Sequence, residues 1–247
     1  MKKTKKIFLG LAIFLILLIG ISLIYLSTGT YNSKDLAKAH MVSDKKATVV
    51  IDNGIEFIPS APNGTGIILY QGAKVDVSAY SVEAKILADN GYAVFIPKMP
   101  FNMAFFGINR AGNIIKDNPD ISKWYMAGHS LGGSMAAKFT SKNQDIIDGL
   151  ILLASYSVDD LSAYNGKVIS IIGSKDMGID KEKLDKTSVN LPKNTEFYTI
   201  NGGNHSQFGD YGFQKGDNIA DISLEKQLQL ITDRILEYLQ QNSETKN

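Results

Sequence analysis

The 247-residue sequence contains no cysteine. This absence excludes disulfide bonds, thiolate metal sites and a cysteine nucleophile, and it is compatible with an oxidising environment. Histidine is scarce, with three residues in the chain, so any imidazole chemistry depends on His40, His129 or His205. No Gly-Lys-Ser or Gly-Lys-Thr sequence is present, which argues against nucleotide binding through a phosphate loop.

Acidic residues are missing from the first 26 positions, which hold four lysines. Residues 7–26 are uncharged and apolar. At about 1.5 Å per residue, a helix of this length would cross the roughly 30 Å hydrocarbon core of a bilayer. Because basic flanks stay in the cytoplasm, we predict a single-pass signal-anchor at residues 1–26, with the rest of the chain on the extracytoplasmic side of the cell membrane. Cleavage near Ser27-Thr28-Gly29, giving a secreted protein, is the alternative.

Beyond this segment acidic residues slightly outnumber basic ones, so no nucleic-acid partner is expected. Residues 27–46 are polar and predict a solvated tether, with a short helix near residues 35–41. Residues 47–247 are long enough for one α/β domain.

Patterns typical of strands and helices alternate through this domain. A hairpin is predicted at residues 47–58, around the turn Asp52-Asn53-Gly54. Apolar runs typical of buried strands lie at 66–70, 92–96, 124–127, 149–153 and 167–172, with a last strand at 195–200. Helices are predicted at 76–90, 108–116, 134–139 and 223–238. The order predicts an eight-stranded, mostly parallel sheet with helices on both faces. The segment 154–166 is too short for a separate cap domain.

Residues 128–133, Gly-His-Ser-Leu-Gly-Gly, stand between a predicted strand and a predicted helix. Strand, Gly-x-Ser-x-Gly and helix in this order are typical of a nucleophile elbow, and a plain glycine-rich turn is the alternative. Gly128 and Gly132 would give the tight turn the room it needs. We therefore predict Ser130 as a nucleophile, with the start of the following helix directed at any oxyanion formed beside it.

A serine hydroxyl needs a base to remove its proton. His40 lies in the predicted tether, and His129 adjoins Ser130 in the turn, where successive side chains diverge. His205 lies in a glycine-flanked loop after the last strand and is the favoured base.

The base in turn needs an acid that fixes its tautomer. Asp176 is favoured because Gly173 lets the chain turn at the end of a strand. Asp159 and Asp160, after the preceding strand, are the alternative position. Asp210 is close to the base in sequence and could brace its loop.

An oxyanion hole needs two convergent backbone N–H groups. We expect one from Leu131 and the other from Ala73, in the loop after the strand at 66–70. An apolar segment after the strand at 92–96 predicts a wall of the substrate pocket, with core packing as the alternative. Its residues are Met99, Phe101, Met103, Phe105 and Phe106.

The motifs at 70–76, 96–100, 128–133 and 202–212 together resemble those of lidless bacterial α/β-hydrolases that are membrane-anchored or secreted. The resemblance covers roughly residues 47–240 and implies the α/β-hydrolase fold. It also implies Ser130 as nucleophile, Asp176 as acid and His205 as base. The chain departs from lipase patterns in having no His-Gly-Gly-Gly motif, and Gln71 stands where histidine is frequent.

We therefore expect a serine hydrolase of the carboxylesterase kind, acting through an acyl-enzyme on a small-molecule or polymer-end acyl substrate. No metal or organic cofactor is expected. Acyl transfer by the same residues, and a catalytically silent surface-binding or scaffold protein with this fold, are the alternatives. The sequence leaves the oligomeric state open.

Overall fold

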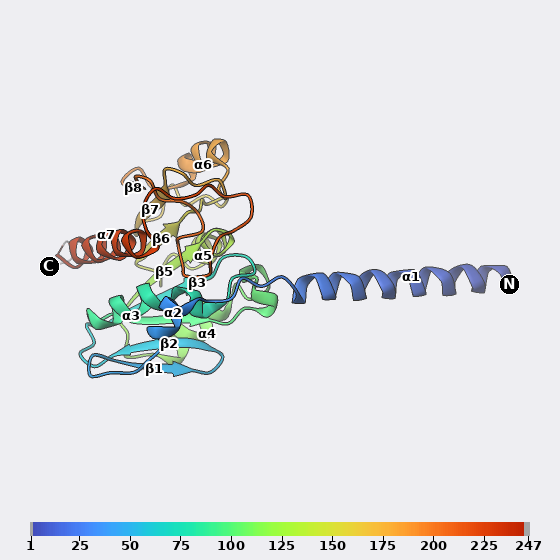
Figure 1. Cartoon of the computed structure of the whole chain (residues 1–247), viewed down its shortest axis with the longest axis horizontal. Coiled ribbons are helices and arrows are strands. Elements are labelled where there is room, and N and C mark those ends of the chain that lie inside the picture. Colours follow the sequence, from blue (N-terminus) through green and yellow to red (C-terminus); the bar gives the residue numbers. More distant parts are fainter. Residues whose placement is uncertain (1, 245–247) are drawn as a thin grey trace. The chain divides into compact units, whose positions relative to one another are not determined.

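The computed structural model describes residues 2–244, in an N-terminal unit that ends at Thr30 and a larger unit that begins at Tyr31 (Figure 1). The N-terminal unit consists of helix α1 (Lys2–Ser27). This helix includes the segment 7–26 for which a membrane span was predicted. The span itself is not supported, because no helix among the described residues combines the length and the apolar character needed to cross a membrane.

The larger unit is built on one eight-stranded sheet with the order β1-β2-β4-β3-β5-β6-β7-β8 (Figure 1). The strands are β1 (Ala47–Ile51), β2 (Gly54–Pro59), β3 (Thr65–Tyr70), β4 (Ala93–Pro97), β5 (Lys123–His129), β6 (Gly149–Leu153), β7 (Lys167–Gly173) and β8 (Glu196–Ile200). β1 pairs antiparallel with β2, and β2 antiparallel with β4. All other pairs are parallel. The predicted eight-stranded, mostly parallel sheet is confirmed.

The helices of the larger unit include those predicted between the strands and after the last strand, together with one at residues 181–187 that was not predicted. They are α2 (Asp35–Ala39), α3 (Ser81–Asp89), α4 (Arg110–Asp117), α5 (Leu131–Lys142), α6 (Lys181–Thr187) and α7 (Leu224–Glu244), with the short 3₁₀ turns η1 (Val77–Tyr80), η2 (Pro100–Asn102), η3 (Ala104–Phe106) and η4 (Ser188–Asn190). The helix expected at 76–90 is therefore split into η1 and α3. The segment 154–166 forms no helix or strand.

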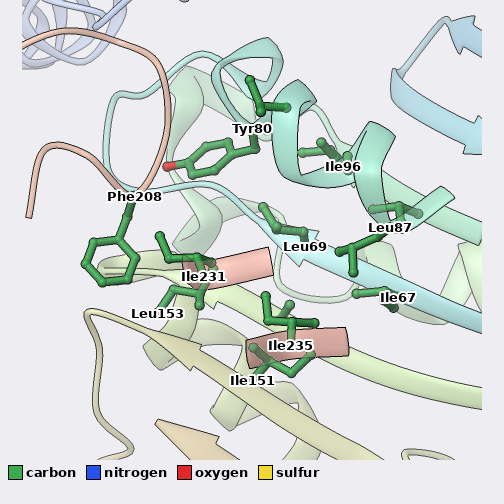
Figure 2. Packing of buried hydrophobic residues seen from close by; sticks show 14 of the residues in the cluster. Ile67, Leu69, Tyr80, Leu87, Ile96, Ile151, Leu153, Phe208, Ile231 and Ile235 are labelled. Carbon is green, nitrogen blue, oxygen red and sulfur yellow. The ribbon is translucent and has the colours of Figure 1, made fainter. Parts of the chain in front are cut away.

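The sheet buries one hydrophobic cluster on each face. In β3, Ile67 and Leu69 belong to one cluster, whereas Ile68 and Tyr70 belong to the other, as the two-residue period of a strand requires. Helices α3 and α7 supply the first cluster, and α4 and α5 supply the second. Figure 2 shows the first cluster, with side chains of α7 lying against strands of the sheet. Because helices cover both faces of the sheet, we look for a binding or catalytic site at an edge of the sheet.

Residues 31–46 do not form the solvated tether expected from their composition. Ala37 is fully buried, and its N–H donates to the carboxylate of Asp210 at 2.8 Å. Asp44 forms an ion pair with Lys85 at 2.8 Å. This packing could not be predicted from the polar composition of the segment, because it uses the small side chain of Ala37 and a backbone N–H group.

Candidate active site

The predicted reactive side chains follow three strands of the parallel part of the sheet. Ser130 follows β5, Asp176 lies just after β7, and His205 lies just after β8. Because β5 to β8 run parallel, their carboxyl ends meet at one edge. Sites of open α/β sheets lie at this edge.

Ser130 occupies a strained backbone conformation between β5 and α5, with φ 54° and ψ −123°. Its N–H donates to the carbonyl of Leu153 at 2.9 Å. Its own carbonyl accepts from the Ser155 hydroxyl at 2.7 Å and from the N–H of Gly133 at 3.0 Å. A conformation of this kind persists only where surrounding bonds enforce it. The sharp strand-to-helix turn predicted for the elbow is therefore present.

Two glycines permit the elbow. A Cβ atom on Gly128 would lie 2.5 Å from the carbonyl carbon of Gly132. A Cβ atom on Gly132 would lie 2.2 Å from the carbonyl oxygen of Tyr70 and 2.4 Å from that of Gln71. The start of α5 thus lies directly against the end of β3, which brings the loop after β3 close to the elbow.

Replacing Gly132 with alanine should lower the free energy of unfolding by about 3 kcal/mol, because backbone atoms on both sides would have to move. The matched control is Gly112→Ala in α4, where the nearest atom to an added Cβ is 4.0 Å away. That change should be neutral or stabilise by up to about 1 kcal/mol, since alanine favours a helix interior. Urea unfolding of the two variants measures the difference. Equal stabilities would show that the elbow can relax around a side chain.

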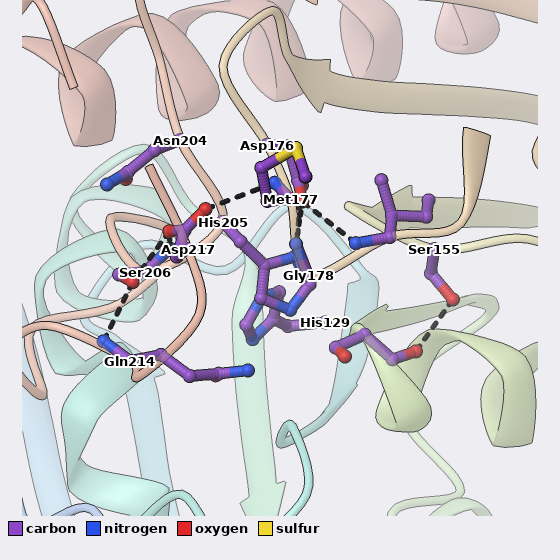
Figure 3. Close-up of polar contacts among 12 residues, drawn as sticks. His129, Ser155, Asp176, Met177, Gly178, Asn204, His205, Ser206, Gln214 and Asp217 are labelled. Carbon is purple, nitrogen blue, oxygen red and sulfur yellow. Dashed lines mark hydrogen bonds and ion pairs between the residues drawn. The ribbon is translucent and has the colours of Figure 1, made fainter. Parts of the chain in front are cut away.

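Asp176 and His205 form a buried hydrogen-bonded pair (Figure 3). Oδ2 of Asp176 lies 2.9 Å from Nδ1 of His205, and the side chains are 0% and 1% exposed. The other carboxylate oxygen, Oδ1, accepts from the N–H groups of Gly178 at 2.8 Å and Ile179 at 2.9 Å. These bonds hold the carboxylate in one orientation.

The pairing determines which nitrogen of His205 can act as a base. An ionised carboxylate only accepts hydrogen bonds, so Nδ1 carries the proton that is donated to Asp176. Nε2 is then the unprotonated nitrogen. It is buried and has no hydrogen-bond partner in the described part of the chain, so it makes no bond to the Ser130 hydroxyl in this structure.

Gly178 is a site residue that sequence reasoning missed. A Cβ atom there would lie 2.4 Å from both Cγ and Cδ2 of His205. The ring of His129 also packs against the ring of His205, with 4.6 Å between the ring centroids. Because these contacts join separate loops, no local motif indicates them.

The alternative acids lie elsewhere. The exposed carboxylate of Asp160 accepts from the N–H of Ser162, and bonds to this serine hold the pKa of Asp160 below its usual value. Oδ2 of Asp159 is buried and has no partner in the described residues. Asp210 lies in the loop of His205 and braces it: its carboxylate accepts from the N–H of Ala37, and its own N–H donates to the carbonyl of Ala79.

The remaining two histidines are far from equivalent. His40 ends α2, and its Nδ1 lies 2.8 Å from the carbonyl oxygen of Leu36. His129 is fully buried, stacks on Phe208 with 5.6 Å between centroids, and has Nδ1 2.9 Å from the Tyr80 hydroxyl. Burial, and next the neighbouring imidazole of His205, hold the pKa of His129 well below its usual value.

The two expected oxyanion donors belong to adjoining segments. Leu131 is the first residue of α5, so its N–H has no acceptor within the helix. In the loop after β3 the N–H of Gly72 donates to Tyr80, and that of Lys74 to Asn102. Among the bonds described in this loop, none uses the N–H of Ala73. Both predicted donors are half-exposed.

The predicted pocket residues divide into two groups. Met99 is buried in the hydrophobic cluster on the α4–α5 face, as the core-packing alternative required. Met103 is half-buried, and the three phenylalanines are exposed. Cavities of about 520 and 230 Å³ in the described part of the chain are lined by residues other than these five, so neither is the predicted pocket.

The sequence at residues 66–229 matches the alpha/beta hydrolase family. This match covers more than half of the chain, and the protein therefore belongs to that family. No curated protein matches the sequence.

Solved structures agree on the fold. Est1E from Butyrivibrio proteoclasticus has 18% identity and a TM-score of 0.55, covering 79% of this chain and 99% of that one. A monoacylglycerol lipase from Paleococcus ferrophilus has 12% identity and a TM-score of 0.57, covering 78% and 99%. A CIB-like hydrolase from Thermoplasma acidophilum has 16% identity and a TM-score of 0.57, covering 76% and 98%. At these identities the similarity shows the α/β-hydrolase fold.

Proposed function

We propose that the protein is a serine hydrolase that cleaves an ester or a related acyl bond, with Ser130 as nucleophile, His205 as base and Asp176 as acid. The observation that carries the proposal is the buried Asp176–His205 pair, whose free Nε2 belongs to the same sheet edge as the strained elbow. Family membership supports the same chemistry.

In the proposed reaction the Ser130 oxygen attacks the acyl carbon while Nε2 of His205 takes the hydroxyl proton. Electrons of the carbonyl double bond move to its oxygen, and the N–H groups of Leu131 and Ala73 would stabilise that oxyanion. The tetrahedral intermediate collapses, His205 returns the proton to the departing alcohol, and an acyl-enzyme remains. Water, deprotonated by the same nitrogen, then releases the acid and restores the serine.

The missing bond between Ser130 and His205 is compatible with this reaction. Catalytic hydrogen bonds are often long in free enzymes and tighten when substrate binds. Ser130 is half-buried, so the residue is not enclosed by the fold.

Three exposed phenylalanines support an apolar acyl group or chain end as the bound part of the substrate. Phe106 contacts Phe101 and Phe105 edge-on, with centroids 5.7 and 5.5 Å apart. Phe101 and Asn102 both have positive φ, at 55° and 52°, a conformation that costs energy and is concentrated at functional sites. The Asn102 carbonyl accepts from the N–H of Lys74, so this aromatic segment is bonded to the loop after β3.

Replacing Phe105 with alanine should raise KM about fivefold for esters with long or aromatic acyl groups, because apolar surface buried by the substrate is lost. KM for an acetate ester and kcat for both should change little. The matched control is Phe197→Ala on β8, since Phe197 is 59% exposed and Phe105 is 61% exposed. Steady-state kinetics over graded acyl lengths provide the measurement. Est1E has been solved with ferulic acid bound, so a ferulate ester belongs in the series. If Phe105→Ala and Phe197→Ala change KM equally, the aromatic segment is not part of the substrate site.

Attachment to the cell membrane through residues 7–26, with the hydrolase domain outside, remains a prediction, as does the secreted alternative. Fractionation of cells expressing the full chain, with proteinase treatment of intact cells, would test both.

A further inference from the structure

The hydroxyl of Tyr80 joins the loop after β3 to the histidine of the elbow. Its oxygen accepts from the N–H of Gly72 at 2.8 Å and lies 2.9 Å from Nδ1 of His129. All three residues are buried. Figure 2 shows the Tyr80 oxygen directed out of its hydrophobic cluster, on the side where Phe208 lies. An added Cβ on Gly72 would lie 2.8 Å from Nδ1 of His129, so only glycine fits between the two side chains.

The hydrogen-bonding capacity of Tyr80 determines where the protons of His129 lie. Burial raises the pKa of the Tyr80 phenol above its usual value, so the hydroxyl keeps its proton. Gly72 is already a donor to the oxygen, and the hydroxyl proton needs an acceptor. If Nδ1 of His129 also donated, the Tyr80 proton would be buried without a partner, which is costly. With the proton on Nε2 instead, Nε2–H makes no bond of standard geometry, but the backbone of His205 still acts on this ring as a hydrogen-bonding group. Tyr80 is thus the donor to Nδ1, and the single imidazole proton of His129 lies on Nε2.

This arrangement places a neutral imidazole against the base. The rings of His129 and His205 lie 4.6 Å apart at an interplanar angle of 44°, and the two side chains lie together in Figure 3. Phe208 covers His129 in a parallel stack. Nε2 of His129 has no hydrogen-bond partner in the described part of the chain. An unpaired buried donor is rare in native proteins and needs an explanation.

We propose that His129 is a positioning residue for the base: Tyr80 holds it as the neutral Nε2–H tautomer, and its uncharged ring supports His205 while His205 becomes charged during acyl transfer. The inference rests on the proposed function. It also links the two halves of the site, because the Tyr80 hydroxyl that sets the tautomer also holds Gly72, which precedes the expected oxyanion donor Ala73.

The groups that face this unit are mostly uncharged. His129 meets Tyr80 from η1, and His205, Phe208 and Tyr211 from the segment after β8. Three carboxylates lie beyond these rings. Asp176 pairs with His205. The charge of Glu83 in α3 raises the pKa of Tyr80, and burial raises the pKa of Glu83 itself to about 8. The charge of Asp217 raises the pKa of Tyr211. None of the carboxylates is hydrogen-bonded to His129. The backbone of His205 raises the pKa of His129, but burial and the charge of the neighbouring His205 ring lower it by more, so the neutral form of His129 is favoured.

The tautomer can be measured without turnover. With only three histidines in the chain, long-range ¹H–¹⁵N spectra of the full-length protein are assignable by single substitutions. We expect the His129 ring to carry its proton on Nε2 and to stay neutral through the pH range in which the protein is active. In Tyr80→Phe the spectrum should change to a mixture of tautomers. A proton on Nδ1 in the unsubstituted protein, or a charged His129 at the pH of activity, would overturn the inference.

Kinetics test the coupling to the base. Tyr80→Phe should lower kcat about tenfold with KM nearly unchanged. The acidic limb of the pH profile of kcat/KM should move to higher pH by about half a unit, because an unprotonated nitrogen of His129 would favour the charged form of His205. The control is Tyr164→Phe, which removes a buried hydroxyl bonded to the carbonyl of Ile147 at 2.6 Å on the other face of the sheet. It should lose comparable stability with an unchanged pH profile.

A second variant separates the base from the loop. His129→Phe keeps a ring against His205 but can neither accept from Tyr80 nor hold a proton, while Gly72 keeps its acceptor. A lowered kcat with a shifted acidic limb supports the role of His129. If the acidic limb of the kcat/KM profile is unshifted in both His129→Phe and Tyr80→Phe, the loss of kcat in Tyr80→Phe comes from the lost bond to Gly72. That result would overturn the proposal. Because the spectra need no activity, they also distinguish this failure from a failure of the hydrolase assignment, which Ser130→Ala tests.

Discussion

Replacing Ser130 with alanine should lower kcat for ester hydrolysis by about a million-fold, the loss expected when a serine nucleophile is removed. No covalent intermediate could form without the hydroxyl oxygen. Stability should hardly change, with a Tm shift of about 2 °C or less, because the bonds that maintain the elbow use backbone atoms of this residue. Initial rates and thermal unfolding of the full-length variant measure both effects.

Ser141→Ala in α5 is the control, since its hydroxyl donates to the carbonyl of Lys138 at 3.0 Å within the same helix. An organophosphorus serine probe should label the unsubstituted protein and Ser141→Ala equally, and should not label Ser130→Ala. A folded protein that no probe labels would favour the silent scaffold. Transfer of the acyl group to an added alcohol in preference to water would favour an acyltransferase.

Replacing Asp176 with asparagine should lower kcat about ten-thousand-fold. The amide can present an N–H to Nδ1 of His205, which shifts the imidazole proton to Nε2 and removes the base. The oxygen of the amide can still accept from Gly178 and Ile179, so the fold should survive. Steady-state kinetics with a small ester measure the loss, and circular dichroism verifies the fold.

Asp159→Asn and Asp160→Asn are matched controls from the alternative position. The Asp160 carboxylate bonds to Ser162, and neither side chain bonds to His205. Both variants should keep nearly full activity. Loss of activity in one of them, with Asp176→Asn active, would reassign the acid.

The elbow shows why much of this protein was predictable. Gly128 and Gly132 are needed because an added Cβ would meet backbone atoms, and this demand leaves a motif of local spacing in the sequence. The apolar runs that form β3 to β7 report burial on both faces in the same local way. The pair of Asp176 and His205 was expected from strand order, since parallel strands end at one edge.

Other features left no local signal. The packing of residues 31–46 depends on Ala37 and the distant Asp210, and polar composition suggested a tether instead. The contact of Gly178 with His205, and the hydrogen bond between the Tyr80 hydroxyl and Nδ1 of His129, join segments remote in sequence. Met99 was expected in the pocket with its neighbours but is buried in the core. The hydrophobicity of a side chain does not indicate whether it will face the core or a pocket.

The sequence by itself predicted the order of the strands, most of the helices and the tight turn of the elbow, because each depends on residues a few positions apart. Only the tertiary structure shows that Asp176, and not Asp159 or Asp160, is bonded to His205, and that Gly178 and the ring of His129 pack against that imidazole. These features depend on angles and distances between loops, and such distances arise only when the two hydrophobic clusters close on the sheet.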